Sequence, residues 1–117
     1  MFMDRFITKY TIREGYLTYI FNRILDDRCL FIESAKFAKS SSNINKIIWL
    51  VVKGDPSNSD KLKKLIDDNH EIKKTGNEYI VAVSIEKFVK EHIDRMEFRD
   101  WEWKLEDSTL EISINNF

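Results

Sequence analysis

The sequence predicts a single α+β domain with a ferredoxin-like core. The length of 117 residues suits one hydrophobic core, 43% of the residues are hydrophobic, and strand and helix patterns alternate after residue 46. From about residue 46 to 105 the expected order is βαββαβ, the layout of the split βαβ motif. An extra antiparallel strand follows at the C-terminus, and a mainly helical segment precedes the core. We therefore expect one two-layer domain over residues 1–117.

Two interpretations of residues 5–22 remain open. Apolar residues recur at i, i+4 spacing and predict a helix around residues 12–27; they are Ile12, Tyr16, Ile20 and Ile24 in one row and Leu17, Phe21 and Leu25 in another. Several of them are also strand formers, and residues 13–15 could turn a hairpin between residues 5–12 and 16–22. Residues 29–32 have no clear period, and the spacing of Ala35, Phe37 and Ala38 could continue a helix.

The strand and helix signals are clearer after a serine-rich segment at residues 40–43. Residues 46–52 (KIIWLVV) are a run of strand formers that Gly54-Asp55-Pro56 ends. Ser59 is placed to cap a helix whose apolar residues follow at i, i+3 and i+4 spacing.

The next segment predicts a hairpin and a second capped helix. Residues 71–85 contain a turn signal at residues 75–77 and then a strongly apolar strand. Ser84 is placed to cap a helix over residues 85–95.

The face pattern of these strands predicts their order in the sheet. Residues 47–52 and 79–83 are apolar at odd and even positions alike, which is typical of central strands. Residues 71–74 are polar enough for an edge. Because two helices cover only one face of such a sheet, we expect residues 1–39 to cover the other face of the 46–117 core.

The stretch FRDWEWKLED (residues 98–107) places two tryptophans one residue apart among charged residues. With a two-residue turn at Asp107-Ser108, one face carries only apolar cross-strand pairs: Leu105 with Leu110, Trp103 with Ile112 and Trp101 with Ile114. The opposite face is polar and carries the pairs Lys104 with Glu111 and Glu102 with Ser113. A shift of one residue would expose the tryptophans, so we expect both in the core. A change of phase predicts a bulge near residues 99–100.

Charge is balanced overall but unevenly placed. The 19 basic and 20 acidic residues nearly cancel, so no global field draws the chain to nucleic acid or to an anionic membrane. Residues 1–53 carry nine bases and five acids, whereas residues 96–117 carry two bases and six acids, a local charge of −4. Such a cluster often only aids solubility, but it also suits a basic partner.

The composition favours a soluble cytoplasmic protein without membrane contact. Cys29 is the only cysteine, which excludes an internal disulfide and a cysteine-based zinc site and fits a reducing compartment; we expect a buried, inert thiol. Asp4 and Arg5 lie near the start of the sequence, where a signal peptide would need an unbroken apolar stretch. The longest apolar run, residues 47–52, is too short to span a bilayer.

The sequence contains no diagnostic catalytic or metal motif. His70 and His92 have no second ligand at metal spacing, and we expect His92 to be a hydrogen-bonded core residue. Asp67-Asp68 near His70 are expected to be solvated carboxylates. The loop at residues 54–59 lacks the glycines and lysine of a phosphate loop, so we expect a capped strand-to-helix connection. We expect no metal, no cofactor and no catalysis.

The βαββαβ layout of residues 46–105 resembles the RNA-recognition motif. Ile48-Trp49-Leu50 is similar to the hydrophobic-aromatic-hydrophobic element of that family's first strand, whose aromatics stack bases. The third strand departs from the family pattern, because residues 75–77 are Thr, Gly and Asn where the family has a basic residue, glycine and an aromatic. Only Tyr79 matches a family aromatic position. The resemblance therefore implies the architecture.

Two functions follow as expectations. The first is a non-enzymatic protein-binding module, of the kind that immunity proteins, antitoxins and phage-encoded inhibitors represent, which contacts a basic protein partner. Its contact surface is the acidic C-terminal hairpin, with Asp100, Glu102, Lys104, Glu106, Asp107 and Glu111. The alternative is an RNA- or DNA-binding module that uses the sheet or the basic N-terminal half. The identity of the partner and the oligomeric state stay open.

Overall fold

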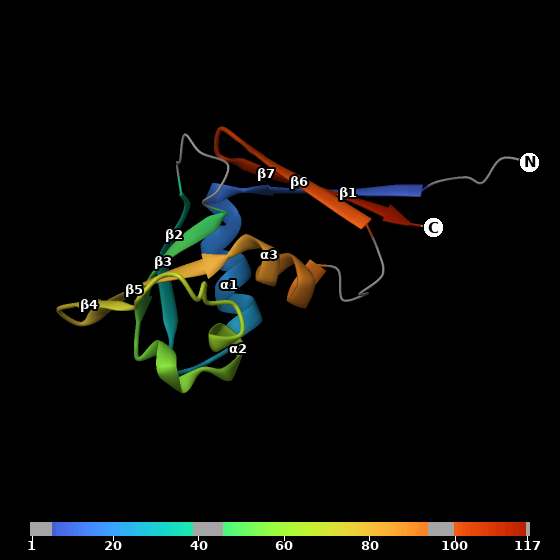
Figure 1. Ribbon diagram of the computed structural model, residues 1–117. Coiled ribbons are helices and arrows are strands. Elements are labelled where there is room, and N and C mark those ends of the chain that lie inside the picture. The colour runs from blue at the N-terminus through green and yellow to red at the C-terminus, as the bar shows by residue number, and fades with distance from the viewer. Residues whose placement is uncertain (1–5, 39–45, 94–99, 117) are drawn as a thin grey trace, which may run out of the picture.

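The computed structural model describes residues 6–38, 46–93 and 100–116 and contains two antiparallel sheets and three short helices (Figure 1). One sheet has three strands in the order β1-β7-β6, and the other has four in the order β2-β3-β5-β4. This arrangement confirms the predicted α+β class. The three-stranded sheet extends to one side of the helices in Figure 1.

The four-stranded sheet has the centre and the edge that the sequence predicts. Its strands are β2 (Phe31–Phe37), β3 (Ile47–Lys53), β4 (Lys73–Thr75) and β5 (Glu78–Ser84). The apolar strands β3 and β5 pair with each other at its centre, and the polar strand β4 lies at one edge. The turn between β4 and β5 contains Gly76 at φ 62°, as a tight hairpin requires.

The ferredoxin-like strand order was wrong. In that order the last strand of the βαββαβ unit would lie beside β3, but β2 occupies this place and β6 belongs to the other sheet. The register of β2 shifts between Ile32 and Ser34, so a bulge interrupts its alternation of buried and exposed residues. This bulge explains why the sequence shows no clear period there. The helix suggested around residues 35–38 was therefore also wrong.

Both interpretations of residues 5–22 were partly right. Residues 6–13 form β1 (Phe6–Arg13), the 3₁₀ turn η1 (Glu14–Tyr16) follows, and α1 spans Leu17–Leu25. Of the rows predicted for the helix, Leu17, Phe21 and Leu25 are buried. The N-terminal segment is thus not mainly helical, because it supplies one strand to each sheet.

Serine caps begin the two short helices after β3, as predicted. The Ser59 hydroxyl accepts a hydrogen bond from the Leu62 N–H at 3.1 Å at the start of α2 (Asp60–Lys63). The Ser84 hydroxyl accepts one from the Lys87 N–H at 3.3 Å at the start of α3 (Ile85–Phe88). The turn η3 (Val89–Ile93) continues α3 as a π-helix. Residues 94 and 95 of the predicted helix lie outside the described residues.

All three helices lie on the same face of the four-stranded sheet (Figure 1). The Phe21 ring of α1 lies 5.2 Å from the Phe88 ring of α3, between centroids. On the opposite face Trp49, Val51 and Ile80 are only half-buried. Ile47 and Ala82 on this face are buried, and α1 lies with the other helices on the other face, so the cover by residues 1–39 stays a prediction.

The three-stranded sheet contains the predicted C-terminal hairpin in the predicted register. Strands β6 (Asp100–Glu106) and β7 (Thr109–Asn116) pair Leu105 with Leu110, Trp103 with Ile112 and Trp101 with Ile114. Leu110, Ile112 and Ile114 are buried in the main core, and Trp103 packs against that core while half-buried. The predicted bulge near residues 99–100 falls partly outside the described residues.

Contacts of Glu14 and Lys46 connect this hairpin with the four-stranded sheet. The Glu14 N–H donates to the Ser108 carbonyl oxygen at 2.8 Å, and a carboxylate oxygen of Glu14 accepts from the Phe37 N–H at 3.1 Å. The Lys46 ammonium lies 4.4 Å from the centre of the Trp103 ring. None of the helices in the described ranges is long and apolar enough to cross a membrane.

Candidate functional site

The residues predicted for the contact surface all belong to the β6–β7 hairpin. Glu102, Lys104 and Glu106 alternate along β6, and Glu111 lies opposite Lys104 on β7. These residues lie on the outer face, away from the buried Leu110, Ile112 and Ile114. Asp107 is exposed in the turn at φ 55°, a left-handed conformation that Asp tolerates. Asp100 begins β6, and its side chain is outside the described part of the structure.

We call Glu102, Glu106, Asp107 and Glu111 the acidic ridge, and Lys104 lies within it. The Lys104 ammonium is 3.3 Å from a Glu111 carboxylate oxygen and 3.6 Å from one of Glu106. The hydrogen bond with Glu111 raises the pKa of Lys104, and the nearby charges of Glu111 and Glu106 add to the effect. Because these groups are exposed, the pairs contribute little to stability and remain available to a partner.

Strand β1 adds basic residues to this surface, which no local pattern in the sequence predicts. In the register of β1 with β7, Lys9 lies opposite Ser113 and Arg13 opposite Thr109, on the same outer face as Glu111. One edge of the face is thus basic and the other acidic. The pairing of β1 with a strand about 100 residues later cannot be read from a local pattern.

The structure separates the two aromatic residues that resemble RNA-stacking positions. Trp49 pairs with Ala82 and Val52 pairs with Tyr79, so Trp49 and Tyr79 point to opposite faces of the sheet. Tyr79 packs against the core under the helices, whereas Trp49 lies on the face without helices. The two rings therefore cannot stack successive bases on one surface.

Asp67 and His70 form a hydrogen-bonded pair in the loop before β4. One Asp67 carboxylate oxygen lies 3.2 Å from His70 Nδ1 and accepts the Asn69 N–H at 2.8 Å. Burial would raise the pKa of Asp67, but the bonds from Asn69 and His70 outweigh it and lower this pKa. The His70 ring meets the Trp49 ring edge-on at 5.4 Å. The expectation of a solvated carboxylate was wrong for Asp67, whose half-buried carboxylate binds two groups of its own loop.

The connection between β3 and α2 is the capped loop that the sequence predicts. The Asp55 carboxylate accepts hydrogen bonds from the N–H and hydroxyl of Ser57 at 2.9 and 2.7 Å and begins the 3₁₀ turn η2 (Pro56–Asn58). The bond from the Ser57 hydroxyl is the main reason that the pKa of Asp55 is lowered. Cys29, expected to be buried, is exposed.

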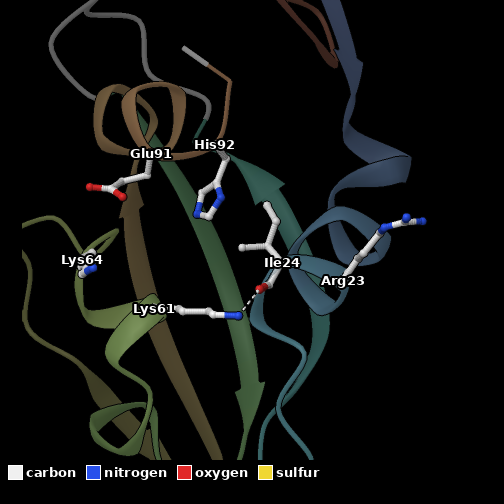
Figure 2. A pocket seen from close by; sticks show the side chains of 6 residues that line it. All are labelled: Arg23, Ile24, Lys61, Lys64, Glu91 and His92. Carbon is white, nitrogen blue, oxygen red and sulfur yellow. Dashed lines mark hydrogen bonds between the residues drawn. The ribbon is translucent and has the colours of Figure 1, made fainter. Parts of the chain in front are cut away.

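A cleft of about 380 Å³ opens where α1, α2 and η3 meet, and no pattern in the sequence predicts it. It is lined by Arg23, Ile24, Lys61, Lys64, Glu91 and His92. Figure 2 shows the His92 ring above the Lys61 side chain, with Ile24 on one side and Lys64 and Glu91 on the other. The Arg23 guanidinium points away and donates to the Tyr19 hydroxyl at 2.9 Å. His92 is half-buried, with its ring 6.0 Å from that of Phe88.

Within residues 6–38, 46–93 and 100–116, no three His, Cys, Asp or Glu side chains are grouped so that they could hold a metal ion. The chain matches no protein-family model, no curated protein and no solved structure.

Proposed function

We propose that the protein is a non-enzymatic, cytoplasmic protein-binding module whose acidic ridge contacts a basic protein partner. The observation that carries this proposal is the position of four exposed carboxylates on one hairpin whose other face is buried in the core. A stoichiometric inhibitor of the immunity-protein or antitoxin kind fits such a surface, because it needs affinity for a target and no catalytic group.

The ridge offers charge without a large cost of reorganisation. Its four carboxylates and the Lys104 ammonium give a net charge of −3 on a paired β-hairpin. The side chains of Glu106 and Glu111 are 73% and 48% exposed, so a partner can approach them directly. A backbone held in paired strands needs little ordering on binding, and exposed charges of one sign accelerate association with a partner of the opposite sign.

The basic edge formed by Lys9 and Arg13 limits the orientation of the partner. A uniformly basic target would be attracted by the ridge and repelled at β1, which lies on the other side of β7. The complementary partner surface therefore carries its positive charge opposite β6 and the hairpin turn. Such repulsion contributes to specificity as much as the attraction does.

The test is a charge-reversal pair with a matched control. Glu102→Lys with Glu106→Lys reverses two ridge charges and removes the exposed pair between Glu106 and Lys104. Glu71→Lys with Glu86→Lys changes the net charge equally and removes the exposed pair between Glu86 and Lys90, whose groups are 3.1 Å apart. Glu111 is left unchanged, because a lysine in its place would lie directly opposite Lys104 and destabilise the hairpin.

The wild type and both variants are used to capture partners from native lysate with and without nuclease. The proposal predicts a protein that survives nuclease, is lost with the ridge variant and is retained with the control variant. A protein that all three forms retain equally would contradict the acidic ridge as the contact surface. Capture that disappears after nuclease treatment would instead support the RNA- or DNA-binding alternative.

A further inference from the structure

The cleft between α1, α2 and η3 lies in the helical layer, apart from the acidic ridge, and has the opposite charge. Arg23, Lys61 and Lys64 line it together with a single carboxylate, that of Glu91. Because the Arg23 guanidinium points away, the groups that face the cleft sum to +1 with His92 counted as neutral, in a chain whose net charge is −1. A local positive site on a negatively charged protein favours a small anion over a polyanion such as nucleic acid.

Two lysines that line the cleft lie close together along the chain. Lys61 lies in α2 and Lys64 directly follows it, three positions later, so they are neighbours on the same helical surface. The Lys61 ammonium contacts the Ile24 carbonyl oxygen at 3.4 Å, which is long for a hydrogen bond. That contact leaves two of its three N–H groups for a ligand. Because the Lys61 ammonium points toward Ile24 in Figure 2, an anion held by both ammonium groups requires the Lys61 side chain to turn toward Lys64.

The other lining groups narrow the class of anion. Ile24 offers an apolar contact next to the lysines, and the His92 imidazole offers the face of its ring (Figure 2). The Glu91 carboxylate would repel a second anionic group, but it can accept hydrogen bonds from hydroxyl groups of a ligand. A volume of about 380 Å³ is within the range of small-molecule sites.

We propose that this cleft binds a phosphate monoester carried on a small hydroxylated body, such as a sugar phosphate. Lys61 and Lys64 hold the phosphate oxygens, His92 and Ile24 contact the body, and Glu91 accepts from its hydroxyl groups. Ammonium groups form strong charge-assisted hydrogen bonds with phosphate. The proposal does not depend on the acidic ridge or on a protein partner.

The test uses ribose 5-phosphate, ribose and a short oligothymidine as probes. Their binding to the full chain is measured by changes in its amide chemical shifts. Lys64→Met is the main variant, because the Lys64 ammonium forms no hydrogen bond or ion pair within the described part of the chain. Lys61→Met with Lys64→Met is the second. Lys63→Met is the control, since Lys63 is an exposed residue of α2 that does not line the cleft.

We expect ribose 5-phosphate to shift the amides of residues 23, 24, 61, 64, 91 and 92, and ribose to shift none. Lys64→Met should weaken binding about tenfold, the effect of losing one charge-assisted hydrogen bond. The double variant should abolish binding, and Lys63→Met should leave it unchanged. The proposal is overturned if ribose 5-phosphate does not bind, if Lys64→Met and Lys63→Met behave alike, or if the oligonucleotide binds more tightly than the monoester.

Discussion

The three glycines of the chain provide a graded test of the fold. Gly54 has φ 98°, and a Cβ added there would clash with the carbonyl oxygen of Cys29 and lie 3.0 Å from Leu30 Cδ2. Gly76 has φ 62° with open space around it, and Gly15 has neither a positive φ nor a neighbour within 4 Å. Substitution by alanine should therefore have three different effects on the free energy of unfolding.

The expected magnitudes follow from these environments. Gly54→Ala combines backbone strain with a clash against a backbone oxygen that no rotamer can avoid, and it should cost about 3 kcal/mol or more. Gly76→Ala carries only the strain of a left-handed residue, about 1 kcal/mol. Gly15→Ala should stabilise by about 0.5 kcal/mol, since it reduces the freedom of the unfolded chain without a new contact.

Urea unfolding followed by circular dichroism measures all three variants against the wild type. A loss of about 3 kcal/mol corresponds to a decrease in Tm of about 12 °C for a domain of this size. If Gly54→Ala unfolds like the wild type while Gly76→Ala is destabilised, the turn after β3 does not pack against Cys29 and Leu30. The connection between α1 and β2 would then need a different path.

Three further predictions concern stability. Trp103→Ala should lower the free energy of unfolding by about 2 kcal/mol, less than the loss of a fully buried tryptophan costs, because Trp103 is half-buried. An unchanged urea unfolding curve would show that Trp103 is not part of the core. A hydrogen bond with Glu33 raises the pKa of Glu78 above its ordinary value of 4.5, so the folded state disfavours the charged carboxylate. Glu78→Gln should therefore raise Tm at pH 7, and this gain in Tm should vanish as the pH falls below 4.5. A gain in Tm that persists at about pH 3 would contradict this cause. Deletion of residues 1–39 removes β1, α1 and β2 and should abolish cooperative unfolding, which a sigmoidal thermal transition of residues 40–117 would contradict.

Local chemistry made several elements predictable. Ser59 and Ser84 mark their helices because a hydroxyl satisfies an N–H of the first turn wherever the helix lies in the fold. The C-terminal hairpin is predictable because only one register places Trp103 opposite Ile112 and Lys104 opposite Glu111. Strands β3 and β5 reveal their central position through apolar residues on both faces.

The elements that were predicted wrongly depend on pairing between distant parts of the chain or on a local irregularity. The bulge between Ile32 and Ser34 removes the alternation by which β2 could be identified. The pairing of β1 with β7 joins the two ends of the described chain, and no local signal selects it over a pairing with β2. Because β2 completes the four-stranded sheet, β6 is free to pair with β7 in a second sheet, which the ferredoxin-like prediction did not allow.

The candidate surfaces also differ in how far the sequence alone predicts them. The acidic ridge lies on one hairpin, so its alternation of Glu102, Lys104 and Glu106 is visible in the sequence. The cleft combines residues of α1, α2 and η3 that are up to about 70 positions apart, and only the fold brings them together. The basic edge at Lys9 and Arg13 likewise depends on the pairing of β1 with β7.

The most direct test of the acidic ridge is the association rate of the captured partner at several salt concentrations. The wild type, Glu102→Lys with Glu106→Lys, and Glu71→Lys with Glu86→Lys are compared by stopped-flow fluorescence. If the ridge steers association, the first variant should bind roughly tenfold more slowly at low salt and show a weaker dependence on salt, while the second stays close to the wild type. Equal rates for both variants, with wild-type unfolding curves, would contradict the ridge as the contact surface.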